Sequence, residues 1–586
     1  MAARARGSRR GPVVRWSLGA VLAVFVVWVI ASGFMLWRTS SGAGKGLDAL
    51  DRARGSLNAA ALLRGWGTDD LEHARGDFAT AHNDADSAVL APWRVIPFVG
   101  SNVSSVEALT GTAEQVAAVV ERAARASAKV VARQPTTGVE RLGLLADLGR
   151  ISARAERSLA GVDLGTDFFL ARPMDDARER FLERLVQLRN AVADTGKVMG
   201  GLGELLAGPR RYLVLAANNA EMRAGSGMFL SAGVATFTDG AFVISDMRPS
   251  AEYNLGTAVP LPPALEKLWG FTPLGRDWRY LAMSPRFDAN APVAAEMWKA
   301  ATGETVDGVL AVDPVTLQAL LKAQGSVTVT AGDRTMNSDD VVEYLMRGQY
   351  TGVGLDDPAQ SDRRDQLGVV ASAAVDTLTS RTWDVQALVR DLTHAGGGRH
   401  ILAWARDPLE QRTWEAAGIA GTLQADSLLP AVLNTSGNKL DPYLRIRAEL
   451  TLTDRPDGGR DVKVTLRIRN EAPGGLPPYI GGPHPGTDLV EGEYQGIVAI
   501  NTPGVGSLPG IEGAEPVLVT GDDGETKVVG ALVRLLRSEE RTVTVRFSVP
   551  ASLHSIEIDP SARVPAIAWK AGGHRWEDTA ARRLEW

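Results

Sequence analysis

Two charged side chains that could bind a ligand stand in a polar turn between two apolar runs. The segment from Arg211 to Phe237 reads RYLVLAANNAEMRAGSGMFLSAGVATF, and its turn carries the carboxylate of Glu221 and the guanidinium of Arg223. Glycine and asparagine give such a turn backbone freedom, and loops at strand ends commonly bind ligands. The pattern predicts a hairpin that presents both side chains, and a plain surface ion pair is the alternative.

A second acid and base, Asp246 and Arg248, close the next apolar run in SDMRPSAEYN. If that run is a strand beside and parallel to the first, both pairs reach the same sheet edge, where α/β folds bind ligands. Arginine contacts phosphate through two hydrogen bonds, and carboxylates hold Mg²⁺. Together the pairs could hold a diphosphate with Mg²⁺. No other cofactor is indicated, and no residue is assigned as a metal ligand.

The third candidate is the segment SDRRDQ, which begins at Ser361 and opens an apolar helical pattern. Helix N-termini favour anions, and Arg363 and Arg364 would add formal positive charge. The alternative is a solvated first turn in which Asp362 and Asp365 neutralise the two arginines.

Several other chemistries lack their motifs. The AGSG turn has no third glycine at Leu230 and no Gly-Lys-Ser/Thr element, which excludes the common NAD and ATP fingerprints. The seven histidines have no zinc-ligand spacing, and no GxSxG element occurs. Zero cysteines exclude disulfides and thiol nucleophiles. Asp307 and Asp313 in VDGVLAVDP are expected as turn and cap residues.

The composition indicates several folded units. The chain has 586 residues, of which 45% are apolar and 23% charged, so two to four units are expected. A net charge of -6 and a pI near 5.8 argue against a nucleic-acid-binding face.

Residues 16–37 (WSLGAVLAVFVVWVIASGFMLW) contain no charged side chain and, at about 1.5 Å per residue, would span about 33 Å as a helix. This predicts one transmembrane helix in the lipid bilayer. Five arginines and no acidic residue precede it, which predicts that residues 1–15 form a cytoplasmic basic tail. The expected localisation is single-pass in the cytoplasmic membrane, with the bulk of the chain extracytoplasmic. A cleaved signal peptide is the alternative.

Three patterns follow along the chain. Residues 38–208 are rich in Ala, Leu, Arg and Glu, which predicts an α-helical stalk or bundle. In residues 209–430 strand-like and helix-like runs alternate, which predicts an α/β or α+β domain. Residues 431–586 alternate in β fashion between Gly and Pro turns, which predicts an antiparallel β-sandwich. The expected fold class is therefore multidomain.

Several motifs in order resemble a known family. From about residue 210 to 560, NNAEMRAGSGMF, VDGVLAVDPVTLQALLKAQGSVTV, NSDDVVEYLMRGQY, HILAWARDPLEQ and LNTSGNKLDPYLRIR resemble the bacterial family called domain of unknown function 4012. The upstream PWRVIPFVG and the helical region resemble its members from high-GC Gram-positive bacteria. These typically carry one N-terminal anchor and often occur with exopolysaccharide genes. No reaction is established for the family.

A weaker resemblance is to the LytR-CpsA-Psr phosphotransferases, which move glycopolymers from a polyprenyl-diphosphate carrier to the cell wall. It rests on GVLAVDPVTLQALLKAQGSVTV and SDRRDQLGVVASAAVDTL. By position, this resemblance implies ligand contacts for Arg223, Arg248, and Arg363 or Arg364, within an α/β domain of that kind. The chain departs from the pattern because the Arg-x-Asp-Thr element is missing and Pro249, not Asp, follows Arg248.

Two functions follow from these observations. The first is a membrane-anchored extracytoplasmic protein of cell-envelope or exopolysaccharide assembly that binds a polyprenyl-diphosphate-linked glycan. If catalytic, it would direct an acceptor hydroxyl at the β-phosphorus. The alternative is a non-catalytic scaffold or binding module for cell-wall polymers or partner proteins, which the missing aspartates favour. Convergence of Arg223, Arg248 and Arg363 in one pocket would favour the first function, and their separation would favour the second. Neither nucleic acid nor a nucleotide cofactor is expected as a partner.

Overall fold

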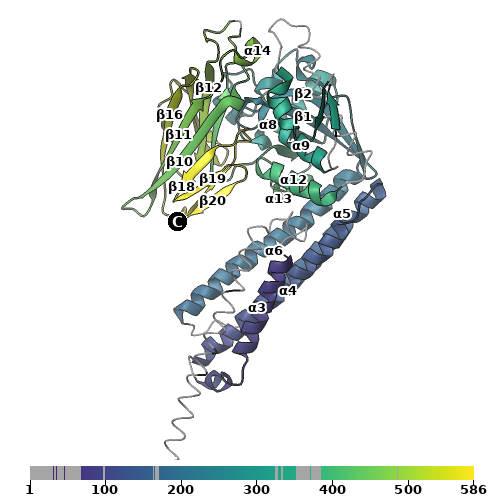
Figure 1. The fold of residues 1–586 in the computed structure, drawn as a ribbon, viewed down its shortest axis with the longest axis vertical. Coiled ribbons are helices and arrows are strands. Elements are labelled where there is room, and N and C mark those ends of the chain that lie inside the picture. The colour runs from purple at the N-terminus through teal and green to yellow at the C-terminus, as the bar shows by residue number, and fades with distance from the viewer. Residues whose placement is uncertain are drawn as a thin grey trace, which may run out of the picture. The chain divides into compact units, whose positions relative to one another are not determined.

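The computed structural model describes residues 68–586 except 97–98, 163, 165–170, 324–327, 332–333, 351–369, 371–383 and 485, together with residues 31, 35 and 45. The chain divides into two compact units. Unit 1 comprises Met1–Val131 and Leu148–Gly196, and unit 2 comprises Ala132–Asp147 and Lys197–Trp586. Figure 1 labels the elements along the chain.

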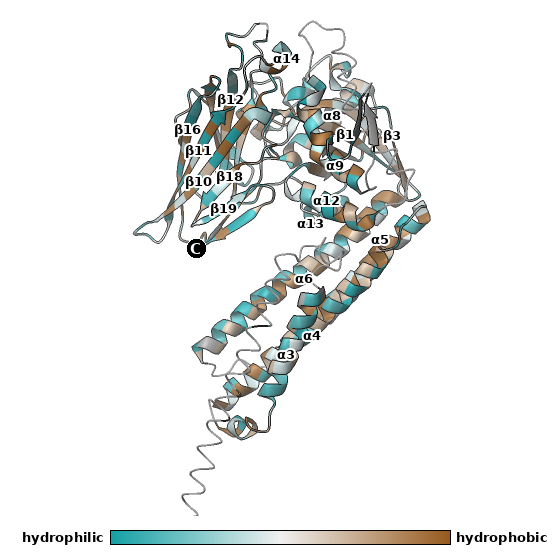
Figure 2. Ribbon diagram, viewed as in Figure 1, coloured by the Kyte–Doolittle hydropathy of each residue, from teal (hydrophilic) through white to brown (hydrophobic). Residues whose placement is uncertain are grey.

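Unit 1 is helical, and its longest helix carries an apolar stripe. Buried residues of α4 recur every three or four positions, which is the period of one helix face, and they pack on the buried face of α3. Hydrophobic and hydrophilic segments alternate along these helices in Figure 2. The helices are α3 (Thr68–Ala85), η1 (Ala91–Val95) and α4 (Val99–Val131), with α5 (Gly138–Ala160) and α6 (Arg172–Ala207), whose residues are divided between the two units.

The predicted transmembrane helix and the membrane localisation must be corrected. No helix in the described part of the chain is long and apolar enough to cross a membrane. The long helices α4 and α6 carry charged residues along their length, as amphipathic helices do. Residues 16–37, on which the prediction depended, lie outside the described residues, as do residues 1–15. The fold class that the structure supports is helices together with several mixed sheets.

Unit 2 contains a mixed sheet in the order β3-β2-β1-β5-β8, and β4 pairs with β2. β1 lies at the centre, antiparallel to β2 and parallel to β5, and it is buried from Tyr212 onward. The strands are β1 (Arg210–Met222), β2 (Gly227–Thr238), β3 (Ala241–Ile244), β4 (Arg248–Pro249), β5 (Gly308–Val312) and β8 (Ile401–Ala405), and a separate hairpin joins β6 (Thr328–Ala331) and β7 (Arg334–Asn337).

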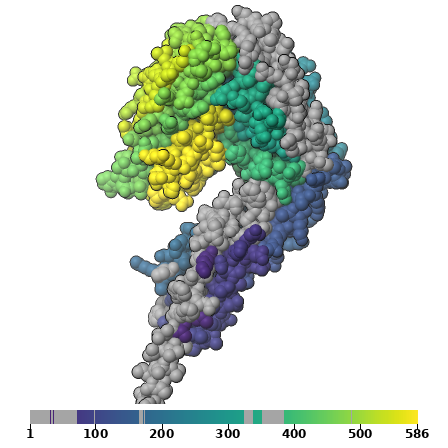
Figure 3. All heavy atoms as spheres, viewed as in Figure 1, coloured from purple at the N-terminus to yellow at the C-terminus, as the bar shows by residue number. Residues whose placement is uncertain are grey.

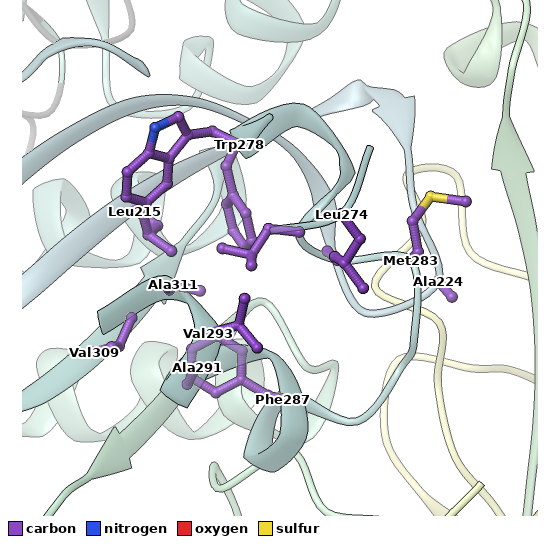
Figure 4. Close-up of a cluster of buried hydrophobic side chains, with 14 of the residues drawn as sticks. Leu215, Ala224, Leu274, Trp278, Met283, Phe287, Ala291, Val293, Val309 and Ala311 are labelled. Atoms are coloured by element: carbon purple, nitrogen blue, oxygen red, sulfur yellow. The ribbon is translucent and has the colours of Figure 1, made fainter. Parts of the chain in front are cut away.

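Helices and 3₁₀ turns accompany this sheet, and an apolar core lies against it. In Figure 4, Leu215 of β1, Val309 of β5 and Phe287 of α8 face a common interior. The elements are η2 (Ser250–Glu252), α7 (Pro263–Trp269), η3 (Trp278–Tyr280), α8 (Phe287–Thr302), α9 (Pro314–Lys322), α10 (Val341–Met346), η4 (Gly348–Tyr350), α12 (Val385–Gly397) and α13 (Pro408–Ala416). As expected, Asp313 caps α9, and its carboxylate accepts hydrogen bonds from the backbone N–H groups of Val315 and Thr316.

The C-terminal part of unit 2 is a sandwich of two six-stranded sheets. Their orders are β13-β16-β11-β10-β18-β19 and β14-β15-β12-β9-β17-β20. The strands are β9 (Ser427–Asn434), β10 (Leu444–Asp454), β11 (Arg460–Asn470), β12 (Tyr494–Pro503), β13 (Gly510–Glu512), β14 (Val517–Asp523), β15 (Thr526–Leu535), β16 (Glu540–Val549), β17 (Ser555–Ile558), β18 (Ala568–Ala571), β19 (His574–Glu577) and β20 (Arg582–Glu585), with η5 (Asp441–Tyr443) and α14 (Pro478–Gly481) between strands.

The sandwich is mixed rather than purely antiparallel, which corrects the sequence prediction. β17 pairs with β9, and β18 pairs with β10, both in parallel. Parallel neighbours need a long connection, and here more than a hundred residues separate each pair along the chain. A short-range alternation of apolar and polar residues, visible along β10 and β11 in Figure 2, reveals strands but not these distant pairings.

A buried carboxylate holds the last turns of the sandwich. Asp578 is 4% exposed, and its oxygens accept hydrogen bonds from the backbone N–H of Ile567 and from the N–H and hydroxyl of Ser561. Burial raises the pKa of Asp578 to about 7, although the backbone donors oppose the rise.

The substitution Asp578→Asn should change the pH dependence of stability. Because the folded pKa exceeds the unfolded value of about 3.9, the folded state binds a proton between these values. That contribution is fully present below about pH 4 and is lost as the pH rises through about 7. The free energy of unfolding of the wild type relative to the variant should therefore fall by about 2 kcal/mol between pH 5 and pH 8 in urea titrations. A pH-independent difference would contradict this. Asp454→Asn, whose carboxylate is 80% exposed, is the control.

Candidate functional site

Glu221 lies at the end of β1 and is buried, not presented to solvent as we expected. Its carboxylate forms an ion pair with the ammonium of Lys439, and the two side chains are 6% and 4% exposed. The rings of Tyr350 and Tyr479 have their centroids 5.4 and 4.4 Å from the Lys439 Nζ atom. Burial alone would lower the pKa of Lys439, but Glu221 and the tyrosines outweigh it and raise that pKa. Lys439 is therefore a charged partner rather than a neutral nucleophile.

Arg223 is also buried, in the turn between β1 and β2, at 5% exposure. Its Nε donates to the carbonyl of Arg279 at 2.9 Å, and its Nη1 donates to the carbonyls of Met222 at 3.0 Å and Asn434 at 2.8 Å. Burial lowers the pKa of Arg223, against the opposing effect of Glu221. The guanidinium thus joins the β1–β2 turn to the end of β9 and is occupied by carbonyl oxygens.

Asp441 is the centre of this buried polar cluster and has no exposed surface. One carboxylate oxygen accepts hydrogen bonds from the N–H of Met222 at 3.1 Å and from Asn434 at 2.9 Å. The other accepts from Arg563 at 2.9 Å and from the hydroxyl of Tyr494 at 3.3 Å. Both oxygens are therefore satisfied by donors that come from separate segments of the chain.

The remaining predicted residues do not join Glu221 and Arg223. Asp246 and Arg248 are exposed, and β4 pairs antiparallel with β2, so that Arg248 lies opposite Ala232. β2 begins at Gly227, so Arg248 is about 16 Å along the strand from the turn at roughly 3.3 Å per residue. The condition that this run lies beside and parallel to β1 is therefore not met, since β3 and β4 both pair antiparallel with β2. Arg363 and Arg364 lie outside the described residues.

A second buried cluster surrounds His400. Its Nδ1 lies 2.6 Å from an Asp313 carboxylate oxygen, which also accepts a hydrogen bond from Asn219 at 2.8 Å. Asp313 is 1% exposed and His400 is 9% exposed. Since Asp313 also caps α9, this contact fixes the start of that helix against β8. The sequence interpretation of the histidines as surface or structural residues agrees with the place of His400.

Neither cluster offers a set of metal-ligating side chains among the described residues. No group of three or more His, Asp or Glu side chains that could hold a metal ion occurs among the described residues. The carboxylates of Glu221 and Asp441 already accept hydrogen bonds from cationic and neutral donors. A Mg²⁺ ion bound to Glu221 would therefore have to displace Lys439.

An open hollow of about 660 Å³ lies on the sheet β13-β16-β11-β10-β18-β19. We call it the sandwich hollow. Its charged lining comes from four strands and consists of Arg447, Glu449, Arg467, Lys570, Arg575 and Glu577. The strands β11, β10, β18 and β19 lie side by side in Figure 1, and in Figure 3 the C-terminal residues, in yellow, lie against earlier sandwich residues, in green.

Two arginines face each other across the floor of the hollow. Arg447 of β10 and Arg467 of β11 are directly paired in the register, and both are exposed. Neither forms an ion pair or hydrogen bond with another described residue. Like charges directly opposite on neighbouring strands are destabilising, and an anion bound between the two arginines would offset this repulsion. The hollow therefore offers positive charge that an anionic ligand could contact.

The sequence interpretation missed these arginines, although a signal was present. The tetrapeptide LRIR occurs at residues 444–447 and again at 466–469. In each copy the arginines alternate with buried residues, which places them on the outer face of a strand. An antiparallel hairpin of the two copies would have predicted the pairing of Arg447 with Arg467. Lys439 and Arg563 gave no comparable local signal.

Comparison with known proteins gives one match. Residues 207–350 match the model of the family described as "Protein of unknown function (DUF4012)". The match confirms, over these residues, the family resemblance noted in the sequence, and it includes β1, the Glu221 turn and β5. Searches of curated proteins and of solved structures each found no match.

The substitution Lys439→Met should destabilise unit 2 by about 3–5 kcal/mol, because it leaves the Glu221 carboxylate buried without its cation. The double variant Glu221→Gln with Lys439→Met should recover much of that loss, since neither charge then remains. The measurement is the free energy of unfolding in urea.

The matched control is Lys322→Met, since Lys322 pairs with Asp339 at 2.8 Å but the two side chains are 37% and 75% exposed. It should cost less than about 1 kcal/mol. If Lys439→Met lowers the free energy of unfolding by as little as this control does, the buried ion pair does not stabilise unit 2.

Proposed function

We propose that the protein is a non-catalytic binding module of cell-envelope or exopolysaccharide assembly, and that it holds a polymer in the sandwich hollow. The observation that carries this proposal is the open hollow of about 660 Å³, with the unpaired arginines Arg447 and Arg467 at its floor. An open hollow on the outer face of a β-sheet could accept part of an extended chain without a large conformational change.

The absence of catalysis is supported by what the predicted site residues do. Glu221 and Arg223 are buried, and their charged atoms contact Lys439 and backbone carbonyls. A transferase would need such groups free to contact a diphosphate and an acceptor hydroxyl. Arg248 is exposed and separated from them along β2, so these residues form no common pocket.

The envelope part of the proposal is supported by the family resemblance alone. Members of the family from high-GC Gram-positive bacteria, which the chain resembles, often occur with exopolysaccharide genes, and the match over residues 207–350 supports the resemblance to the family. Binding of a polyprenyl-diphosphate-linked glycan through Arg223 and Arg248 is the weaker candidate, because Arg223 is only 5% exposed.

Filling the hollow should abolish polymer binding. Ala568 is exposed on β18 directly opposite Arg447, so the indole of Ala568→Trp would occupy the space beside the arginine pair. We expect the full chain to co-sediment with an insoluble cell-wall polysaccharide fraction, and the variant to lose most of that binding.

The matched control is Thr451→Trp, an exposed position on β10 outside the lining of the hollow. It should bind as the wild type does. If Ala568→Trp also binds normally, or if the wild type binds no polymer, the hollow is not the binding site. If Arg248→Ala alone removes binding, the diphosphate interpretation is favoured instead.

A further inference from the structure

The sandwich hollow is positive although the whole chain is negative. Four basic and two acidic side chains line it, whereas the chain carries a net charge of -6. Within the lining, Lys570 and Glu449 form an ion pair at 2.7 Å and largely offset each other. Lys570 and Arg467 lower the pKa of Glu449, in that order of effect. Among the described residues, Arg447, Arg467 and Arg575 form no ion pair, although Arg467 acts on Glu449 at longer range.

The two aromatic rings in the lining of the hollow are largely covered by other side chains, which makes them a poor platform for neutral sugars. Trp569 is 2% exposed, and its ring stacks on that of Trp576 with centroids 5.9 Å apart and planes 7° apart. The guanidinium of Arg582 lies 4.5 Å from the centroid of the Trp576 ring. Both indoles are therefore engaged within the protein, and charge is the main means of recognition left to the hollow.

The basic residues form two pairs that are offset across the sheet. Arg447 of β10 lies opposite Arg467 of β11. Lys570 of β18 lies opposite Arg575 of β19, and this second pair is displaced from the first by two residues along the strands. With strands about 4.8 Å apart and about 3.3 Å per residue, the centres of the two pairs are about 12 Å apart. Since Lys570 is paired with Glu449, the cations without an ion pair are Arg447 and Arg467 at one end and Arg575 at the other. A single small anion cannot reach both ends, whereas a chain that repeats an anionic group can.

We propose that the ligand of the sandwich hollow is an acidic polysaccharide whose sugars carry carboxylates, and that Arg447 and Arg467 together bind one carboxylate. This inference depends on the proposed function and names its polymer class. Planar carboxylates match the fork of a guanidinium through two parallel hydrogen bonds. The hollow already accommodates one such group, because the Glu449 carboxylate is seated 2.7 Å from Lys570.

The experiment is titration calorimetry of the full chain with three soluble probes: polygalacturonate, the neutral glucan dextran and a poly(glycerol phosphate). We expect polygalacturonate to bind most tightly and its affinity to fall as salt is raised from 50 to 500 mM, because screening weakens exposed charge contacts. Arg447→Gln and Arg467→Gln should each weaken this binding about ten- to hundredfold.

The charge-matched control is Arg541→Gln, which removes an exposed arginine that is paired with Glu539 at 2.7 Å outside the hollow. It should leave the affinity unchanged. The salt series on the wild type needs no variant, so the inference remains testable if a substitution affects folding.

The outcomes separate the inference from the proposed function. If dextran binds as tightly as polygalacturonate and only Ala568→Trp blocks it, the hollow binds polymers but not through charge, and the inference is overturned. Tighter binding of poly(glycerol phosphate) overturns the carboxylate class while keeping the requirement for an anion. If none of the three probes binds and Ala568→Trp has no effect on co-sedimentation, the proposed function itself is wrong.

Discussion

Asp441 has no exposed surface, and its carboxylate must be matched by donors from several parts of the chain. The backbone of Met222 at the end of β1, Asn434 at the end of β9 and Arg563 after β17 supply them. A charge left unmatched in this interior would cost several kcal/mol, so these segments must assemble together. The β1–β2 turn, the β9–β10 connection and the β17–β18 connection therefore behave as one cooperative part of unit 2.

This requirement divides the charged residues of unit 2 by role. Lys439 and Arg563 are charged groups whose partners lie within the fold, and they hold separate strands together. On the outer face of the sandwich, many cations form ion pairs with carboxylates, as Lys570 does, but Arg447 and Arg467 form no ion pair with another described residue. The charges of the first group are neutralised by partners inside the folded unit. The second group lies on the exposed face of the sandwich.

Local patterns in the sequence were sufficient to predict some features. The apolar runs around the Glu221 turn predicted the β1–β2 hairpin, because strand and turn signals are contained within about twenty residues. Asp313 before a proline predicted a helix cap for the same reason. The alternation in the C-terminal part revealed strands such as β10 and β11.

Features that depend on distant partners were not predictable in this way. A polar turn rich in glycine is usually exposed, yet Glu221 is buried because Lys439, 218 residues away, reaches it. Asp246 and Arg248 closed an apolar run as expected, but the register of β4 on β2 decided where Arg248 lies. The parallel pairing of β18 with β10 was likewise absent from any local pattern, and with it one wall of the hollow.

The position of β18 and β19 near the end of the chain determines when the hollow can form during synthesis. The floor of the hollow is complete once β10 and β11 are made, by Asn470, but β18 and β19 follow only at residues 568–577. A nascent chain emerges from its N-terminus, so the LRIR hairpin is exposed long before its neighbours exist. The arginine pair is therefore synthesised about a hundred residues before the two strands that complete the hollow, and the hollow can form only when synthesis is nearly finished.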